Sequence, residues 1–217
     1  MKLLSVNLGR LRPNPFGTWD VTGIDKRPVA GPVAVCVPGP DSADAGLVGD
    51  RIGDPRHHGG PDKAVYAYAR EDLDTWQETL GRPLADGAFG ENLTTLGVDV
   101  NGALIGERWR VGATVVLEVS CPRIPCGTFQ GWLGREGWVK EFTRAAVPGA
   151  YLRVVEPGEI AAGDPVEVVH RPDHDATIAL TFRALTNEPE LLPRLLAADA
   201  LPEEAKERAR RRVGAAG

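Results

Sequence analysis

The sequence predicts an α+β protein, mainly β, with a β-sandwich or barrel in residues 1–170 and three short helices in residues 171–217. Short runs of strand-forming residues recur between turns through the first part, a spacing typical of sandwiches and barrels. Glycine (26) and proline (18) make up about a fifth of the chain and are spread along it. That distribution suits many turns better than one disordered tract. After His170 the composition shifts toward helix-forming segments.

The expected strands are rich in β-branched and aromatic residues, which favour a pleated and partly buried surface. Proline and glycine separate several of them: one run stops at Pro38, and two runs lie on either side of Gly112. They cover residues 1–8, 33–37, 63–69, 109–111, 114–120, 151–155 and 165–169.

Two helices are expected between these strands. In residues 70–80, Leu73, Trp76 and Leu80 follow helical spacing, and Gly81 fits a helix end. A second helix is expected over residues 137–146. Large aromatic side chains are usually buried, so we expect four of them to lie in the core. They are Trp76, Trp132, Trp138 and Phe142.

The tail is expected to form three short helices over residues 175–213. Asp175 is a candidate cap for the first, Asn187 for the second, and Pro202 opens the third. The third helix has acidic residues near its start and basic residues near its end, which suits the helix dipole. This pattern favours a solvated helix over a basic binding patch.

Charge and cysteine content limit the possible functions. The formal net charge is −5, which argues against non-specific nucleic-acid binding because that needs a basic surface. Three cysteines provide no disulfide framework, and a reducing cytoplasm is the simpler compartment. No signal peptide or membrane-spanning run is recognisable.

Several common catalytic motifs are absent from the sequence. There is no Gly-x-Gly-x-x-Gly after a strand, no Walker loop and no Gly-x-Ser-x-Gly elbow. Three cysteines also cannot supply a four-cysteine iron–sulfur cluster. Redox chemistry would therefore need electrons from a separate partner.

The most informative stretch is the Cys-Pro-Arg-Ile-Pro-Cys sequence at residues 121–126, which follows a predicted strand. Its two prolines stiffen the turn. A thiolate at Cys126 is a nucleophile and a soft-metal ligand, and Arg123 could lower its pKa or bind an anion. The alternatives are a buried structural cysteine, or a zinc half-site made with Cys121.

Three further segments offer polar groups to a ligand. His57 and His58 precede Gly-Gly-Pro, and adjacent side chains in extended backbone point opposite ways, so we expect only His58 to reach a given pocket. Asn92 follows a glycine-rich turn and offers both a donor and an acceptor to a heterocycle. Lys26 follows Thr-Gly-Ile-Asp and is a candidate anion clamp. The alternatives are a solvated loop histidine, a self-bonded asparagine and a surface lysine.

Taken in order, these segments resemble the MOSC domain family (molybdenum cofactor sulfurase C-terminal domain), and within it the YiiM-like branch with a three-helix appendage. The matching stretches are residues 22–29, 58–65, 89–93 and 120–126, with the tail from about residue 172 to 213. The resemblance covers nearly the whole chain. Each motif alone is weak, and the ordered set of four is specific.

The resemblance implies a closed, antiparallel, barrel-like domain over residues 1–170 that binds a pterin-based molybdenum cofactor, molybdopterin. Cys126 would be the metal ligand and His58 a catalytic proton donor. The cofactor cleft would be lined by Thr22, Lys26, His58, Asn92, Arg123 and Cys126. Position 121 is often Gln in relatives, so Cys121 departs from the pattern as a spectator or a redox partner of Cys126.

The resemblance also implies reduction of N-hydroxylated compounds, such as nucleobase analogues and amidoximes. The electrons would come from a separate donor protein, in the cytoplasm. No membrane or nucleic-acid polymer is expected as a partner. The alternatives are a carrier of a persulfide or of the cofactor, and a structural barrel with a protein-binding helical tail.

Overall fold

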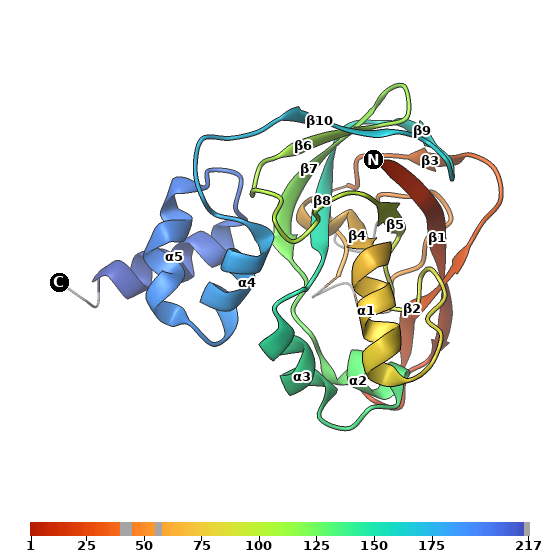
Figure 1. Cartoon of the computed structure of the whole chain (residues 1–217), viewed down its shortest axis with the longest axis horizontal. Coiled ribbons are helices and arrows are strands. Elements are labelled where there is room, and N and C mark those ends of the chain that lie inside the picture. The colour runs from red at the N-terminus through yellow and green to blue at the C-terminus, as the bar shows by residue number, and fades with distance from the viewer. Residues whose placement is uncertain (40–44, 55–57, 215–217) are drawn as a thin grey trace.

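The computed structural model describes residues 1–39, 45–54 and 58–214, and shows a large twisted sheet with helices around it (Figure 1). The main sheet has eight strands in the order β10-β6-β7-β8-β4-β5-β1-β2, and β3 and β9 form a second, small sheet. The strands are β1 Lys2–Pro13, β2 Val21–Pro28, β3 Val33–Val35, β4 Val65–Ala69, β5 Leu93–Leu96, β6 Arg108–Val111, β7 Val115–Pro122, β8 Ala150–Glu156, β9 Gly158–Ile160 and β10 Val166–His170.

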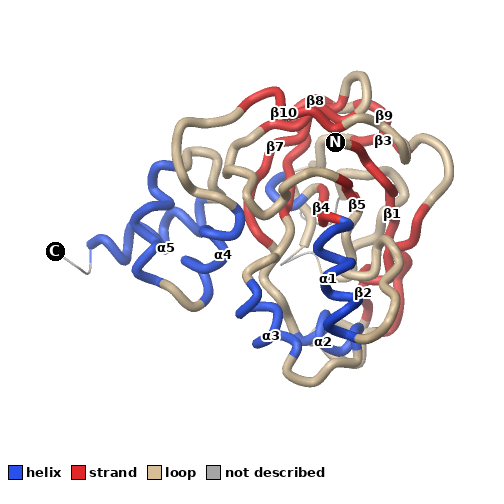
Figure 2. Tube along the Cα trace, viewed as in Figure 1, coloured by secondary structure: helices blue, strands red, loops and turns tan. Residues whose placement is uncertain are grey.

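Helices fill the connections and the tail, as the blue segments of Figure 2 show. The α-helices are α1 Arg70–Leu80, α2 Gly127–Leu133, α3 Trp138–Ala145, α4 Ile178–Thr186 and α5 Glu203–Gly214, and the 3-10 helices are η1 Pro61–Lys63 and η2 Pro189–Ala197. None of the helices in the described ranges is long and apolar enough to cross a bilayer.

The predicted closed antiparallel barrel is wrong in two respects. The eight-stranded sheet is open, because its edge strands β10 and β2 do not pair with each other. The start of β1 does approach β10: Lys2 forms one bridge with Pro165, and the Val166 amide donates a hydrogen bond of 3.1 Å to the carbonyl of Met1. In addition, β4 and β5 pair in parallel, with Ala67 opposite Leu93. The α-helix α1 makes this possible, because a parallel pair needs a long crossover connection.

Strand β4 separates two hydrophobic clusters. All five of its residues are buried, and alternate side chains point to opposite faces. Val65 and Ala67 join an aliphatic cluster that also contains Ile178, Leu192 and Leu195 from the tail. On the other face, Tyr66 and Tyr68 join an aromatic cluster, whose other large rings are Trp76, Phe89, Phe129, Trp138, Phe142, Tyr151 and Phe182.

Most local sequence predictions are confirmed. The helices predicted over residues 70–80 and 137–146 correspond to α1 and α3. Trp76, Trp138 and Phe142 are buried, whereas Trp132 is only half-buried and donates a hydrogen bond of 2.9 Å to the carbonyl of Ala88. Strand β2 and helix α2 were not predicted, because both are glycine-containing segments without a clear period.

The tail contains three helical segments as predicted, but the caps differ. Thr177 caps α4, its hydroxyl accepting a hydrogen bond from the Leu180 amide at 3.1 Å, while Asp175 pairs with Arg194 instead. Asn187 ends α4 and does not begin the next helix.

The chain that enters α4 is tied to the sheet. The Ile178 amide donates to the carbonyl of Ala103 at 2.9 Å, and Thr177 forms a bridge with Leu104. In Figure 1 the tail helices gather on one side of the molecule. They share the aliphatic cluster with the sheet, and the proposed domain division at residue 170 stays a prediction.

Candidate functional site

A single cavity of about 720 Å³ gathers the residues that the sequence analysis singled out. Its volume falls within the range of small-molecule and cofactor sites, roughly 300–1,000 Å³. The predicted residues on its wall are Thr22, Lys26, His58, Asn92, Arg123 and Cys126, and Cys121 lies there as well. Sequence segments as far apart as Thr22 and Cys126 therefore meet at one place. His57 lies outside the described residues.

The cavity borders the aromatic cluster. Ile24, Tyr66, Cys121 and Tyr151 belong to that cluster and also line the cavity. Thr22 lies in strand β2, where its hydroxyl accepts a hydrogen bond of 3.2 Å from the Ile24 amide. A strand holds these side chains more firmly than a loop would.

The Cys-Pro-Arg-Ile-Pro-Cys turn carries the two thiols into different environments. Strand β7 ends at Pro122, and Cys126 occupies the N-cap position of α2, with its carbonyl accepting from the Gln130 amide at 3.1 Å. Cys126 is half-buried on the cavity wall. Cys121 is 7% exposed, and burial raises the pKa of its thiol. Cys126 is therefore the better placed of the two to meet a ligand.

Arg123 is a buried cation at the centre of the turn. Its guanidinium donates a hydrogen bond of 2.6 Å to the carbonyl of Phe89 and lies 3.7 Å from the centre of the Phe129 ring. Burial alone would lower the pKa of Arg123, but the neighbouring Tyr66, Tyr151 and Cys126 favour the cation and the net pKa is raised. The turn thus keeps a fixed positive charge close to the Cys126 sulfur.

Lys26 and Asn92 are organised by a residue that sequence reasoning missed, Asp50. The Asp50 carboxylate accepts from Lys26 Nζ at 2.7 Å, from Asn92 Nδ2 at 2.9 Å and from the Gly9 amide at 2.6 Å. Burial lowers the pKa of Lys26, against the raising effect of Asp50. Asp50 lies in a connecting segment with no motif around it, so no local signal marked it.

Asn92 also has most of its own hydrogen-bonding capacity satisfied by the protein. Its Nδ2 donates to the carbonyl of Asn7 at 3.2 Å as well as to Asp50, and its Oδ1 accepts from the Tyr66 amide at 3.1 Å. The alternative of a self-bonded asparagine does not hold, because the partners of the Asn92 side chain are Tyr66, Asn7 and Asp50. Asn92 holds the cavity wall in shape, and one lone pair of Oδ1 remains for a ligand.

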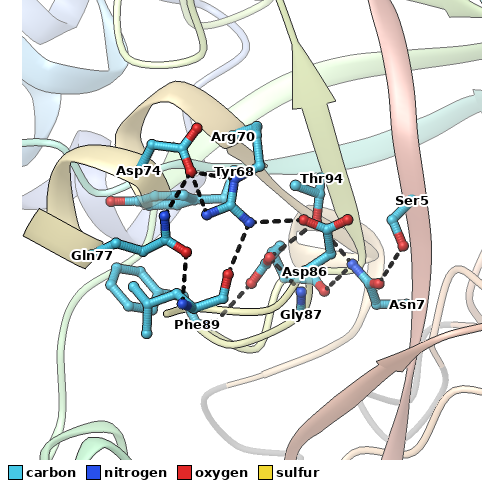
Figure 3. A network of polar contacts seen from close by, with 12 residues as sticks. Ser5, Asn7, Tyr68, Arg70, Asp74, Gln77, Asp86, Gly87, Phe89 and Thr94 are labelled. Atoms are coloured by element: carbon cyan, nitrogen blue, oxygen red, sulfur yellow. Dashed lines mark hydrogen bonds and ion pairs between the residues drawn. The ribbon is translucent and has the colours of Figure 1, made fainter. Parts of the chain in front are cut away.

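Glu91 fixes the turn that precedes Asn92. Its carboxylate accepts from the Gly87 amide at 2.6 Å, the Phe89 amide at 3.0 Å and the Thr94 hydroxyl at 3.0 Å. Figure 3 shows Gly87, Thr94 and Asn7 within the same network of polar contacts. Complete burial raises the pKa of Glu91 to about 7, despite these hydrogen bonds. The turn matters to the site because its Phe89 carbonyl receives Arg123.

His58 is paired with Tyr151 on strand β8. The imidazole Nδ1 lies 2.9 Å from the phenolic oxygen. Burial raises the pKa of Tyr151, so this phenol stays protonated and can share its proton with the imidazole. The pair stands on the cavity wall, close enough to Arg123 and Cys126 for their charges to affect Tyr151.

The described residues offer no metal site made of protein side chains alone. Nowhere in the described ranges do three His, Cys, Asp or Glu side chains meet as a possible metal-binding group. The zinc half-site considered for Cys121 and Cys126 therefore finds no further ligands there. What the cavity does offer is one accessible thiol, buried cations and oriented amides.

Comparison with known proteins identifies a matching family and several relatives. The sequence profile of the MOSC domain matches residues 54–167. The uncharacterised protein YflK of Bacillus subtilis is 35% identical over 182 residues, which are 83% of this chain and 79% of YflK. A protein of Gibberella moniliformis named "Reductase" is 32% identical over 176 residues, 78% of this chain and 29% of the fungal protein.

Among solved structures, YiiM from Geobacillus stearothermophilus superposes with a TM-score of 0.77 at 29% identity, covering 98% of both chains. The likeness therefore includes the C-terminal helices as well as the sheet.

Proposed function

This chain belongs to the MOSC domain family, and we propose that it binds a pterin-based molybdenum cofactor and reduces N-hydroxylated compounds. The observation that carries the proposal is the half-buried thiol of Cys126 on the wall of a 720 Å³ cavity, beside the buried cation of Arg123. The reductase name of the fungal relative points the same way.

The residues present fit such a cofactor. A single soft thiolate suits a metal whose other ligands come from an organic chelate. In this proposal Cys126 holds the metal and Arg123 offsets the negative charge of the cofactor. Thr22, Asn92 and Lys26, whose charge Asp50 balances, contact its polar edges. The cavity is large enough for a ligand of this class.

When bound, the cofactor supplies the two-electron step, and the protein supplies binding, orientation and protons. Reduction of an N–OH group consumes two electrons and two protons, breaks the N–O bond, and releases an amine and water. Imidazoles are the commonest proton donors in such steps. We assign proton delivery to His58, whose Nδ1 is held 2.9 Å from the Tyr151 hydroxyl.

The electrons come from a separate donor protein in this proposal, since the sequence has no recognisable flavin, nicotinamide or iron–sulfur motif. We place the reaction in the reducing cytoplasm, since three cysteines provide no disulfide framework.

The test is metal and pterin analysis of protein purified from a bacterial host that makes the cofactor. The reduction of N-hydroxycytosine and benzamidoxime with a reduced viologen dye is measured on the same samples. Cys126→Ala is expected to lose metal and activity while keeping its unfolding temperature. Cys36→Ala is the matched control, because the Cys36 thiol is also half-buried but faces the carbonyl of Ala45, away from the cavity.

Other results would favour the alternatives. Full activity in Cys126→Ala would remove Cys126 as the metal ligand. A +32 Da adduct on Cys126 that reductant removes, in protein without molybdenum, would indicate a persulfide carrier. Failure to take up any pterin would leave a structural protein.

A further inference from the structure

The C-terminal helices contribute to the wall of the cavity that contains Cys126. Glu204, Ala205 and Arg208 on α5 line it, together with Leu185 at the end of α4. These residues are more than fifty positions away from Cys126 in sequence. They belong to the three-helix tail, whose last helix was expected to be solvated. Helix α5 is therefore part of the site.

The tail is held against the site by Arg153 on strand β8. Its Nη1 donates to the carbonyl of Ala200 at 2.6 Å and lies 3.2 Å from the Glu118 carboxylate, while its Nε lies 2.7 Å from Asp62. Asp62 belongs to the short helix that follows His58. Arg153 therefore fixes the tail relative to the segment that carries the proposed proton donor.

The cavity is positively charged on a negatively charged protein. Among its described lining residues, five are cationic and three are carboxylates, whereas the whole chain carries a formal charge of −5. The cations are Lys26, Arg51, Lys63, Arg123 and Arg208. A local positive field of this kind raises the local concentration of anionic ligands.

The cations differ in exposure: the side chains of Lys26 and Arg123 are the least exposed, Lys63 is half-buried, and Arg51 and Arg208 are exposed. Lys26 and Arg123 are buried, the first against Asp50 and the second against Phe89 and Phe129. Arg208 is solvent-exposed, and its guanidinium orientation is set by a hydrogen bond of 2.8 Å to the carbonyl of Leu185. The buried cations are the better match for a cofactor, which stays bound. The exposed cations are the better match for a substrate, which has to enter and leave.

We propose that Arg208 binds an anionic group of the substrate, so that the preferred substrates are N-hydroxylated nucleotides. This inference rests on the proposed function and adds the substrate class. A guanidinium is well suited to a phosphate because its planar donors match two phosphate oxygens. Glu204, one helical turn before Arg208, opposes the same anion and limits its affinity.

The experiment compares N4-hydroxycytidine 5′-monophosphate with N-hydroxycytosine as substrates of the holoenzyme. The wild type is expected to have the lower KM for the nucleotide. Arg208→Ala should raise the KM for the nucleotide about tenfold, as for the loss of one charge-assisted hydrogen bond, with much less change in the KM for the base. Arg208→Lys should recover part of the loss, and Glu204→Gln should lower the KM for the nucleotide.

Glu207→Ala is the matched control, because Glu207 lies on the same helix but not on the cavity, and it should change neither KM. Binding of cytidine 5′-monophosphate, measured by calorimetry, should weaken in Arg208→Ala and recover partly in Arg208→Lys. The binding test does not depend on catalysis. If the enzyme reduced neither substrate, the proposed function would be contradicted, and the binding test would still decide whether Arg208 binds the nucleotide.

Equal KM values for nucleotide and base in the wild type would overturn the inference. So would an unchanged affinity for cytidine 5′-monophosphate in Arg208→Ala. A fall in the pterin content of Arg208→Ala would also overturn it, because Arg208 would then serve the cofactor.

Discussion

The side-chain amide of Asn92 donates a hydrogen bond of 2.9 Å to the carboxylate of Asp50. The same carboxylate holds Lys26 and the backbone amide of Gly9. One buried acid therefore joins the β1–β2 hairpin to the segment that leads into β5. Two residues that the sequence marked as candidate ligands, Lys26 and Asn92, owe their positions to it.

Replacing Asp50 with alanine should destabilise the protein strongly. The substitution leaves the Lys26 ammonium buried without its counter-charge, which typically costs about 3–5 kcal/mol. The double variant Asp50→Ala/Lys26→Met should be more stable than Asp50→Ala alone, because the unpaired charge is gone. Urea unfolding measures the free energy of unfolding of both variants. Asp199→Ala, at an exposed position, should stay within about 0.5 kcal/mol of the wild type. Equal stability of Asp50→Ala and the wild type would contradict this account.

Replacing Arg123 with alanine should cost about 3 kcal/mol of unfolding free energy. The change removes the hydrogen bond to the Phe89 carbonyl and the contact with the Phe129 ring. Guanidinium chloride unfolding provides the measurement. Arg135→Ala is a suitable comparison, because Arg135 is exposed and pairs with Glu141 at the surface, where an ion pair contributes at most about 1 kcal/mol. Similar losses of unfolding free energy in Arg123→Ala and Arg135→Ala would show that the buried contacts of Arg123 do not stabilise the fold more than a surface ion pair does.

Glu91 should make stability fall as the pH rises from about 4.5 to 7. Its pKa in the folded protein is about 7, above the ordinary value of 4.5, so the folded state binds the proton more tightly than the unfolded state. Since stability decreases with pH wherever the folded state binds more protons, the loss is complete above pH 7 and amounts to roughly 3 kcal/mol.

The neutral variant Glu91→Gln isolates this effect from other titrating groups. The difference in unfolding free energy between wild type and Glu91→Gln should change steadily between pH 4.5 and 7 and stay constant above that range. A difference that does not vary with pH would show that Glu91 has an ordinary pKa in the folded protein.

Gly23→Ala should destabilise the protein through a steric clash with the backbone. A Cβ atom at this position would lie 1.9 Å from the carbonyl oxygen of Arg51, in a segment that lines the cavity. Overpacking of this kind costs about 1–3 kcal/mol. Thermal unfolding should show the loss. Gly214→Ala, where the new methyl group meets nothing within 4 Å beyond its own stretch of helix, should leave the unfolding temperature unchanged or slightly higher. An unchanged unfolding temperature in Gly23→Ala would mean that the segments around Gly23 and Arg51 can move apart to accept the methyl group.

The sequence predicted local structure well wherever a period was clear. The spacing of Leu73 and Trp76 indicated α1, and the apolar run before residue 121 indicated β7. It also identified the turn that carries Arg123 and Cys126. Helix α2 was missed because a seven-residue segment with two glycines has no readable period.

The sequence by itself determined which chemical groups this protein has: two thiols on either side of a guanidinium in a proline-stiffened turn, a histidine beside glycines, and the strand that leads into the turn. The tertiary structure alone decided that the sheet is open, that β4 and β5 run in parallel, that Asp50 organises Lys26 and Asn92, and that α5 borders the cavity. The physical reason is that side-chain periodicity reports contacts a few residues apart. Pairing between distant segments depends instead on how whole faces pack together, and no single stretch of sequence contains that information.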